Sequence, residues 1–273
     1  MDEIKQKAIE QIIDVAIKNF AEGFGIKHKS QVDDPEGVIN AKKNNCFIAE
    51  LGHEFMFYSA FVRSFDSSFG RVLEGIGNAI AILSYEVRGN LNAYLLPQQS
   101  QHMDYMISEY EKNIRPSVND YNSFTWINPK DVRSFSKNHV TDHYFYNKKK
   151  NEHYLIELKA GGDLDNKKAK SEKLALLQEY FILKNFLYEN KEEEAKIFIY
   201  LGTAYNMFGE GNYWKQDRVR QFFANEELLI GKDYWNFVCD DDSGFEIIMN
   251  QYKRSANYIK IALTDIKDMY FGK

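Results

Sequence analysis

The sequence predicts a mixed α/β fold, and three patterns in its middle third support this. Residues 140–146 and 153–159 are short runs rich in aromatic and branched residues, and the polar segment NKKKNE between them predicts an antiparallel hairpin. A helical pattern then runs to about Glu189, and the apolar run KIFIYLG predicts a buried strand. A strand, a helix and a strand in succession normally form a right-handed parallel crossover. Hairpin and crossover together define a mixed central sheet flanked by helices.

The segments before the hairpin are predicted to be mainly helical. Apolar residues recur at helical spacing between Asp2 and Phe20. After the turn signal DDPEG, a second helical region extends from about Ala49 to Tyr85, with an expected interruption near residues 65–70. A shorter helix is expected at about residues 101–113.

Beyond the hairpin, the chain is expected to turn at Gly161 and Gly162 and to enter a helix capped by Ser171. Helical patterns return at 217–227 and 246–268. We therefore expect a single domain over residues 1–273. It would consist of a helical N-terminal part at about 1–90, a catalytic core at about 130–202, and a mainly helical C-terminal part at about 205–273.

Composition restricts the function. The net charge of −5 argues mildly against nucleic-acid binding, but ten basic and six acidic residues lie between Arg133 and Lys173, so this region carries a charge of +4. Cys46 and Cys239 are far apart and belong to no Cys/His cluster, which argues against a disulfide scaffold and a zinc site. No apolar stretch is long enough for a membrane span, so we expect a cytoplasmic protein without a membrane partner.

Asp142, Glu157 and Lys159 are the candidate catalytic residues. If the hairpin closes symmetrically about its six-residue loop, paired residue numbers sum to 299, and Asp142 pairs with Glu157. Directly opposed residues have Cβ atoms about 4.5–5.5 Å apart, so the two carboxylates would stand side by side. Lys159, two residues beyond Glu157, points to the same face.

Two carboxylates that face each other destabilise a sheet unless a cation lies between them. Magnesium binds one or two carboxylates together with phosphate oxygens, and it could activate a water molecule and stabilise charge on a phosphate. Lys159 would then orient or deprotonate the attacking water and offset negative charge on phosphorus. Because E-x-K triplets are also common on solvated strands, an ordinary strand face remains the alternative.

The same residues carry a resemblance to known nucleases. Asp142 followed by Glu157-Leu158-Lys159 at the end of an apolar strand resembles the PD-(D/E)XK nuclease motif, with Thr141 where the motif name has proline. The block YLIELKAGGDLDNKKAKSEKLALLQEYFILKN is similar to the TdeIII-type family of type II restriction endonucleases. RSFDSSFGRVLEGIGNAIA and RVRQFFANEELLIGKDYWNFV resemble further stretches of that family. The similar stretches are scattered over residues 61–238.

This resemblance implies a PD-(D/E)XK nuclease core with additional helical segments at both ends. It implies a homodimer that hydrolyses both strands of double-stranded DNA at a short, pseudopalindromic site and leaves 5′-phosphates. Mg²⁺ would be the cofactor, with Mn²⁺ able to substitute. Asp142 and Glu157 would bind the metal, and Glu74, in the helical region before the sheet, would be an accessory metal ligand or an ordinary helix-surface residue.

Several basic residues are candidates for DNA binding. Arg63 and Arg71 flank Glu74 and would bind phosphate or pair with carboxylates. A basic turn after the catalytic strand would contact the DNA backbone or stay solvated, and two arginines near the C-terminal helices could read guanine; these residues are Lys167, Lys168, Lys170, Arg218 and Arg220. Asp163 and Asp165 are alternative metal ligands to Asp142, or solvated loop acids.

Two other functions remain open from the sequence. One is a repair or junction-resolving nuclease that uses the same site and recognises DNA shape. The other is a non-catalytic DNA-binding or assembly protein in which the carboxylates are structural.

Overall fold

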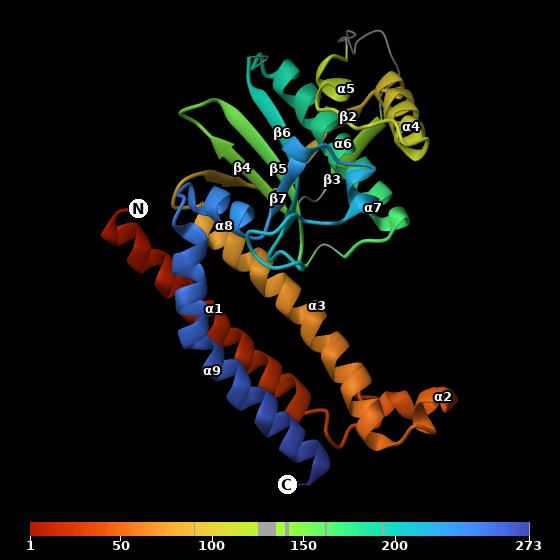
Figure 1. The fold of residues 1–273 in the computed structure, drawn as a ribbon, viewed down its shortest axis with the longest axis vertical. Coiled ribbons are helices and arrows are strands. Elements are labelled where there is room, and N and C mark those ends of the chain that lie inside the picture. Colours follow the sequence, from red (N-terminus) through yellow and green to blue (C-terminus); the bar gives the residue numbers. More distant parts are fainter. Residues whose placement is uncertain (90, 125–134, 140–141, 162, 193, 273) are drawn as a thin grey trace. The chain divides into compact units, whose positions relative to one another are not determined.

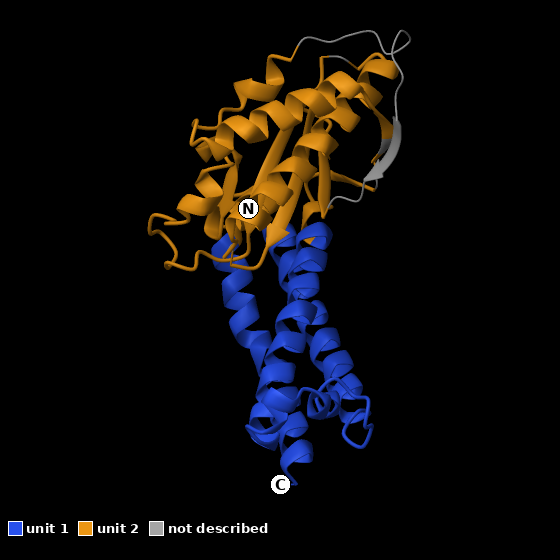
Figure 2. Ribbon diagram, turned by 90° about the vertical axis from the view of Figure 1, so that its right-hand side faces the viewer, with its two compact units in different colours: residues 1–79, 245–273 blue, residues 80–244 orange. Residues whose placement is uncertain are grey.

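The computed structural model describes the chain except for residues 90, 125–134, 140–141, 162, 193 and 273. The described residues form two compact units, one of residues 1–79 and 245–273 and one of residues 80–244 (Figure 2). Val140 and Thr141 of the expected first hairpin strand, and Gly162 of the expected turn, lie outside the described residues. No helix among the described residues is long and apolar enough to cross a membrane.

The first unit is helical. Its main helices are α1 (Glu3–Lys29), α3 (His53–Ala81) and α9 (Gly244–Phe271), and the short elements η1 (Asn40–Asn44) and α2 (Cys46–Ala49) precede α3 (Figure 1). The interruption predicted at residues 65–70 is wrong, because α3 is continuous there. Phe65 and Phe69 pack against Phe20 of α1 at ring-centroid distances of 5.6 and 5.4 Å. This tertiary packing outweighs the weak helix propensity of the serines and glycine in that segment.

The second unit contains a five-stranded mixed sheet in the order β1-β4-β5-β6-β7 (Figure 1). Its strands are β1 (Glu86–Arg88), β4 (His143–Asn147), β5 (Glu152–Lys159), β6 (Lys196–Thr203) and β7 (Leu228–Ile230). β1, β4 and β5 are antiparallel neighbours, whereas β5, β6 and β7 run parallel. The predicted mixed sheet, with its hairpin and its parallel crossover, is therefore confirmed.

The predicted hairpin register is also confirmed. Tyr146 pairs with His153, and all five pairs from His143↔Ile156 to Asn147↔Glu152 follow the same sum. The loop is shorter than expected, because Asn147 and Glu152 already pair and only residues 148–151 form the turn.

Helix α6 (Asn166–Glu189) makes the crossover between β5 and β6. The Asp165 side chain caps it by accepting a 2.8 Å hydrogen bond from the Lys168 backbone nitrogen, so the predicted cap at Ser171 is wrong. The helix thus begins before Ser171, which lies inside it. Leu177 and Phe181 are fully buried in one core cluster with Leu155 of β5.

The remaining elements complete the second unit. β2 (Leu91–Leu95) and β3 (Phe135–His139) form a separate antiparallel pair. The helices are α4 (Pro97–Glu111), α5 (Asn119–Asn122), α7 (Asp217–Arg220) and α8 (Lys232–Cys239), with the 3₁₀ turn η3 (Asn225–Glu227) before β7. The helix predicted over 217–227 is therefore only one turn long, and β7 and α8 follow where no strand was predicted.

Candidate active site

The hairpin brings the three candidate catalytic residues together. Glu157 and Lys159 lie two residues apart near the end of β5, and the Lys159 Nζ is 2.5 Å from the Glu157 Oε1. Asp142 directly precedes β4, where one further step of the observed register would place it opposite Glu157. Its Oδ2 accepts a 3.1 Å hydrogen bond from the Leu158 backbone nitrogen, which fixes the carboxylate against β5.

Glu172 is a fourth member that the sequence reasoning missed. Its Oε1 lies 3.1 Å from the Lys159 Nζ, so the lysine contacts two glutamates from different elements. The missed signal was the N-cap at Asp165. Once α6 begins at Asn166, Glu172 falls in its second turn and can point back towards the end of β5.

Burial dominates the electrostatics of these residues. Both Glu157 and Lys159 are mostly shielded from solvent. Burial, with added repulsion from Asp142, raises the pKa of Glu157 to about 8 although the Lys159 ammonium opposes the shift. Burial by itself would lower the pKa of Lys159, but the Glu157 and Glu172 carboxylates outweigh it and raise that pKa. Lys159 therefore carries its positive charge at neutral pH.

The donor set suits a divalent cation. Asp142 and Glu157 offer carboxylate oxygens, which Mg²⁺ prefers, and a cation would offset the burial and the repulsion from Asp142 that together raise the pKa of Glu157. Among the described residues, no three His, Cys, Asp or Glu side chains are grouped as a metal shell. A cation held by Asp142 and Glu157 would take its other ligands from water and substrate phosphate.

The two histidines of the hairpin are structural. Tyr234 and Tyr144 lie 2.8 Å from the imidazoles of His143 and His153, and both rings are fully buried. Burial lowers the pKa of His143 to about 3 and that of His153 to about 4. Both imidazoles are therefore neutral at physiological pH.

Lys173, the neighbour of Glu172 on α6, belongs to a buried ion pair. It contacts Glu227 of η3, and the two side chains are 0% and 1% exposed. Glu227 also accepts hydrogen bonds of 2.9 Å from the Tyr121 hydroxyl and 2.7 Å from the Ala224 backbone nitrogen. Two adjacent residues of α6 thus contact Lys159 and the segment before β7.

The acids proposed as alternative ligands have other partners. Asp165 caps α6, as described above. Asp163 accepts a long 3.4 Å hydrogen bond from the Gln216 side chain.

The basic residues differ in availability. Lys167 and Lys168 are exposed at the start of α6, whereas Lys170 pairs with Glu111 at 2.6 Å. Arg218 is exposed on α7. The Arg220 guanidinium stacks on Tyr213 at 4.4 Å, contacts Asn225 and donates a 3.0 Å hydrogen bond to the Trp214 carbonyl, so it is already held within the chain.

The other predicted residues belong to the first unit. Glu74, Arg63 and Arg71 all lie on α3, where both arginines are exposed and Glu74 is partly buried. The structure therefore brings together Asp142, Glu157 and Lys159 in the second unit.

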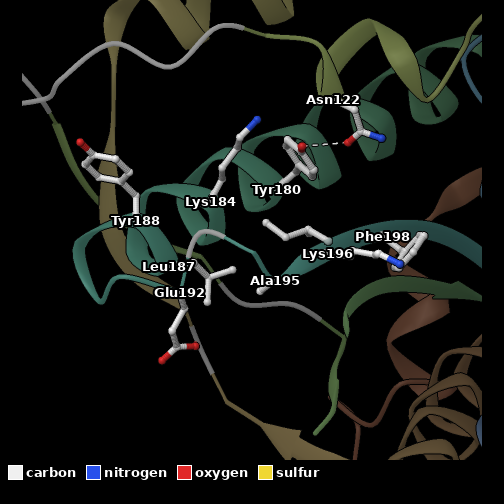
Figure 3. Close-up of a pocket in the computed structure, with 10 residues that line it drawn as sticks. Asn122, Tyr180, Lys184, Leu187, Tyr188, Glu192, Ala195, Lys196 and Phe198 are labelled. Atoms are coloured by element: carbon white, nitrogen blue, oxygen red, sulfur yellow. Dashed lines mark hydrogen bonds between the residues drawn. The ribbon is translucent and has the colours of Figure 1, made fainter. Parts of the chain in front are cut away.

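A separate cavity of about 400 Å³ lies where α6 ends and β6 begins (Figure 3). Tyr180, Lys184 and Phe198 line it, and the Tyr180 hydroxyl donates a 2.8 Å hydrogen bond to Asn122. Lys196 at its edge pairs in register with Glu152, at the opposite end of β5 from Lys159. Seven residues of strand separate these ends by roughly 20 Å, so the cavity lies apart from the candidate residues Glu157 and Lys159.

Comparison with known proteins identifies a matching protein family. Residues 5–256 match the model of a family described as "Type II restriction endonuclease, HinfI". No curated protein and no solved structure matches the chain.

Proposed function

The chain belongs to the HinfI family of type II restriction endonucleases and is a site-specific deoxyribonuclease, and we propose that Asp142, Glu157 and Lys159 form its catalytic site. The observation that carries this proposal is the convergence of two carboxylates and a lysine at the end of the hairpin. Lys159 lies 2.5 Å from Glu157, while Asp142 is hydrogen-bonded to the backbone of the same strand. A stable sheet gains nothing from two neighbouring, partly buried acids, which supports a functional reason for them.

Mg²⁺ is the proposed cofactor, held by Asp142 and Glu157, and Mn²⁺ is expected to substitute for it. When bound, the metal ion would polarise the phosphate and activate water. Lys159 contributes a fixed positive charge beside the reacting phosphate, because its two glutamate neighbours keep it protonated. It therefore orients the attacking water and offsets charge on phosphorus. The alternative that the sequence left open, in which Lys159 deprotonates the water as a base, is less favoured. Glu172 positions the Lys159 ammonium through its 3.1 Å contact.

The proposed reaction is hydrolysis of a phosphodiester bond. A water oxygen attacks phosphorus, the bond from phosphorus to the 3′-oxygen breaks, and a proton passes to that oxygen. The products are a 5′-phosphate and a 3′-hydroxyl.

The proposed substrate is a short pseudopalindromic site in double-stranded DNA, cut by a homodimer that places one catalytic site on each strand. The finer assignments to the TdeIII-type family and to the PD-(D/E)XK fold stay predictions, which the mixed sheet and the class of the matching family support.

Residues outside the catalytic group are proposed to bind DNA or metal. Lys167, Lys168 and Arg218 are exposed and would contact phosphates. Lys170 and Arg220 would do so only by exchanging or sharing their present partners. Arg63, Arg71 and the accessory ligand Glu74 remain candidates on α3.

Cleavage of a DNA of known sequence tests the proposal. The wild-type protein with Mg²⁺ is expected to give discrete fragments with 5′-phosphate ends, and a chelator should stop cleavage until Mg²⁺ or Mn²⁺ is restored. Lys159→Ala should reduce the cleavage rate by at least about 100-fold while binding of a labelled duplex is retained. Lys196→Ala is the matched control, because this exposed lysine lies at the other end of the sheet.

A wild-type cleavage rate in Lys159→Ala would refute the catalytic assignment. Nicking that depends on DNA structure and gives no discrete fragments would instead favour a repair or junction nuclease.

A further inference from the structure

The segment from α2 to the first half of α3 exposes large apolar side chains. Relative exposures are 83% for Phe47, 60% for Leu51, 47% for Phe55, 40% for Tyr58 and 52% for Val62. We call these five residues the α3 apolar face. Soluble proteins seldom expose contiguous apolar patches larger than a few hundred Å² unless the patch binds something.

Helix geometry separates this face from the one that packs inside the first unit. Phe55, Tyr58 and Val62 are spaced by three and four residues, so they share one side of α3. Phe57 and Phe61 point to another side and are buried. There Phe57 contacts Tyr270 of α9 at 5.3 Å and Phe61 contacts Phe24 of α1 at 5.6 Å. The α3 apolar face therefore lies largely outside the core of its own unit, although Tyr58 reaches an aromatic ring of α9, that of Phe271, at a ring-centroid distance of 6.3 Å.

The size of this surface suits a protein interface. Aromatic side chains bury roughly 150–250 Å² each when fully covered, so the exposed fractions of the three aromatic residues, together with those of Leu51 and Val62, amount to roughly 500 Å² on one chain. Two such surfaces in contact would bury about 1,000 Å², near the lower limit for a specific interface. Contact between two copies of the chain would therefore bury enough area for a specific interface.

We propose that the α3 apolar face is the surface through which two copies of this chain associate. The inference rests on the proposed function, because a chain with one catalytic group cuts both strands of a site in a single encounter only when two copies act together. A two-fold axis brings the same patch of each copy into contact, so residues near the axis meet identical residues. Phe55, Tyr58 and Val62 are uncharged and can therefore pack against their own copies near the axis, whereas charged side chains there would face like charges.

A groove of about 390 Å³ between α1 and α9 is less suitable for this role. Ile26 and Ile261 line it, but Lys18, Glu22 and the 2.8 Å ion pair between Lys29 and Asp265 surround them with charge. Ile26 is nevertheless as exposed as the residues of the α3 apolar face. It therefore provides a control of matched character.

The test measures the mass of the purified full-length protein by light scattering. The wild-type protein is expected at twice 32.0 kDa, and Phe55→Glu/Val62→Glu at the mass of one chain with an unchanged far-UV spectrum and thermal midpoint. Ile26→Glu should keep the wild-type mass. The milder Phe55→Ala/Val62→Ala, which introduces no charge, should weaken association by about 100-fold, so the test remains decisive if the glutamate variant misfolds.

The outcomes separate the surface from the proposed function. If folded double variants associate as tightly as the wild type, the α3 apolar face is not the interface, and the proposed function is unaffected. The same conclusion holds if Ile26→Glu alone loses the dimer. A wild-type protein that is monomeric both free and bound to DNA would also overturn it. A wild-type dimer that the double variants dissociate, but that fails to cut DNA with Mg²⁺, would support the surface and refute the proposed catalysis.

Discussion

Replacing Lys173 by methionine is expected to destabilise the second unit strongly. The change removes the cation from a pair in which both side chains are almost completely buried, and it leaves Glu227 inside the core. Breaking a buried ion pair from one side typically costs about 3–5 kcal/mol. The 2.9 Å and 2.7 Å hydrogen bonds from Tyr121 and Ala224 hold the Glu227 carboxylate in place, so it cannot turn towards solvent without losing them.

Two matched variants isolate the charge from the packing. Lys173→Met/Glu227→Gln removes both charges and keeps an oxygen acceptor for the Ala224 backbone nitrogen, while the amide NH2 can donate to the Tyr121 hydroxyl, so its stability should lie within about 1–2 kcal/mol of the wild type. Lys170→Met breaks the solvent-exposed pair with Glu111 on the same helix and should cost less than about 1 kcal/mol.

The assay is urea unfolding at one protein concentration, followed by tryptophan fluorescence, to which Trp214 and Trp235 contribute. Both tryptophans are buried in the second unit and report its unfolding. A loss below about 1 kcal/mol in Lys173→Met, or equal losses in the single and double variants, would refute the argument from the buried charge.

Three further predictions concern the second unit. Because burial lowers the pKa of His143 to about 3, the unfolded chain binds a proton below about pH 6.5 that the folded chain rejects, so stability should fall by roughly 1 kcal/mol per pH unit between these values. His143→Gln should make the measured slope shallower in urea midpoints from pH 7 to 5 without abolishing it, because the buried His153 contributes a slope of its own; an unchanged slope would contradict the prediction. Gly231→Ala should cost about 1–3 kcal/mol in urea unfolding, because Gly231 has φ of +55° and an added Cβ would meet Glu210 and the Asn206 nitrogen. Gly70→Ala, in open space on α3, is the control and should not destabilise. Asp142→Asn removes a charge beside Glu157, so the thermal midpoint should stay equal or rise while cleavage falls at least about 100-fold. Full cleavage would exclude Asp142 from the site.

The parts of the fold that the sequence predicted correctly have strong local patterns. The hairpin register, in which paired residue numbers sum to 299, was predicted from two apolar runs of similar length around a polar loop, and β4 and β5 adopt it. The crossover followed from a strand, a long helix and a strand, and β5 and β6 are parallel.

The parts that failed depend on contacts distant in sequence or on very short elements. The continuity of α3 through residues 65–70 is supported by Phe20, which lies on another helix. β7 is three residues long and pairs only with Leu201 to Thr203 of β6, so no periodicity could identify it. The single domain expected from chain length stays a prediction.

The candidate site shows the same division. Glu157 and Lys159 share a strand face by simple alternation, and Asp142 joins them through a predictable register. Glu172 depends on where α6 begins, and placing the N-cap at Ser171 and not at Asp165 hid it. The contacts of Arg220 with Tyr213 and Asn225 depend on the path of a loop, which no local sequence pattern predicts.

The adjacent residues Glu172 and Lys173 also make the length of the connection after β5 critical. An α-helix turns by about 100° for each residue, and these two neighbours point to Lys159 and to Glu227 respectively. Deleting one residue between Asn166 and Ser171 would keep both Glu172 and Lys173 but swing the acid away from Lys159 and the buried amine out of the core. Related enzymes that keep both pairs should therefore tolerate substitutions in the first turn of α6 far better than insertions or deletions.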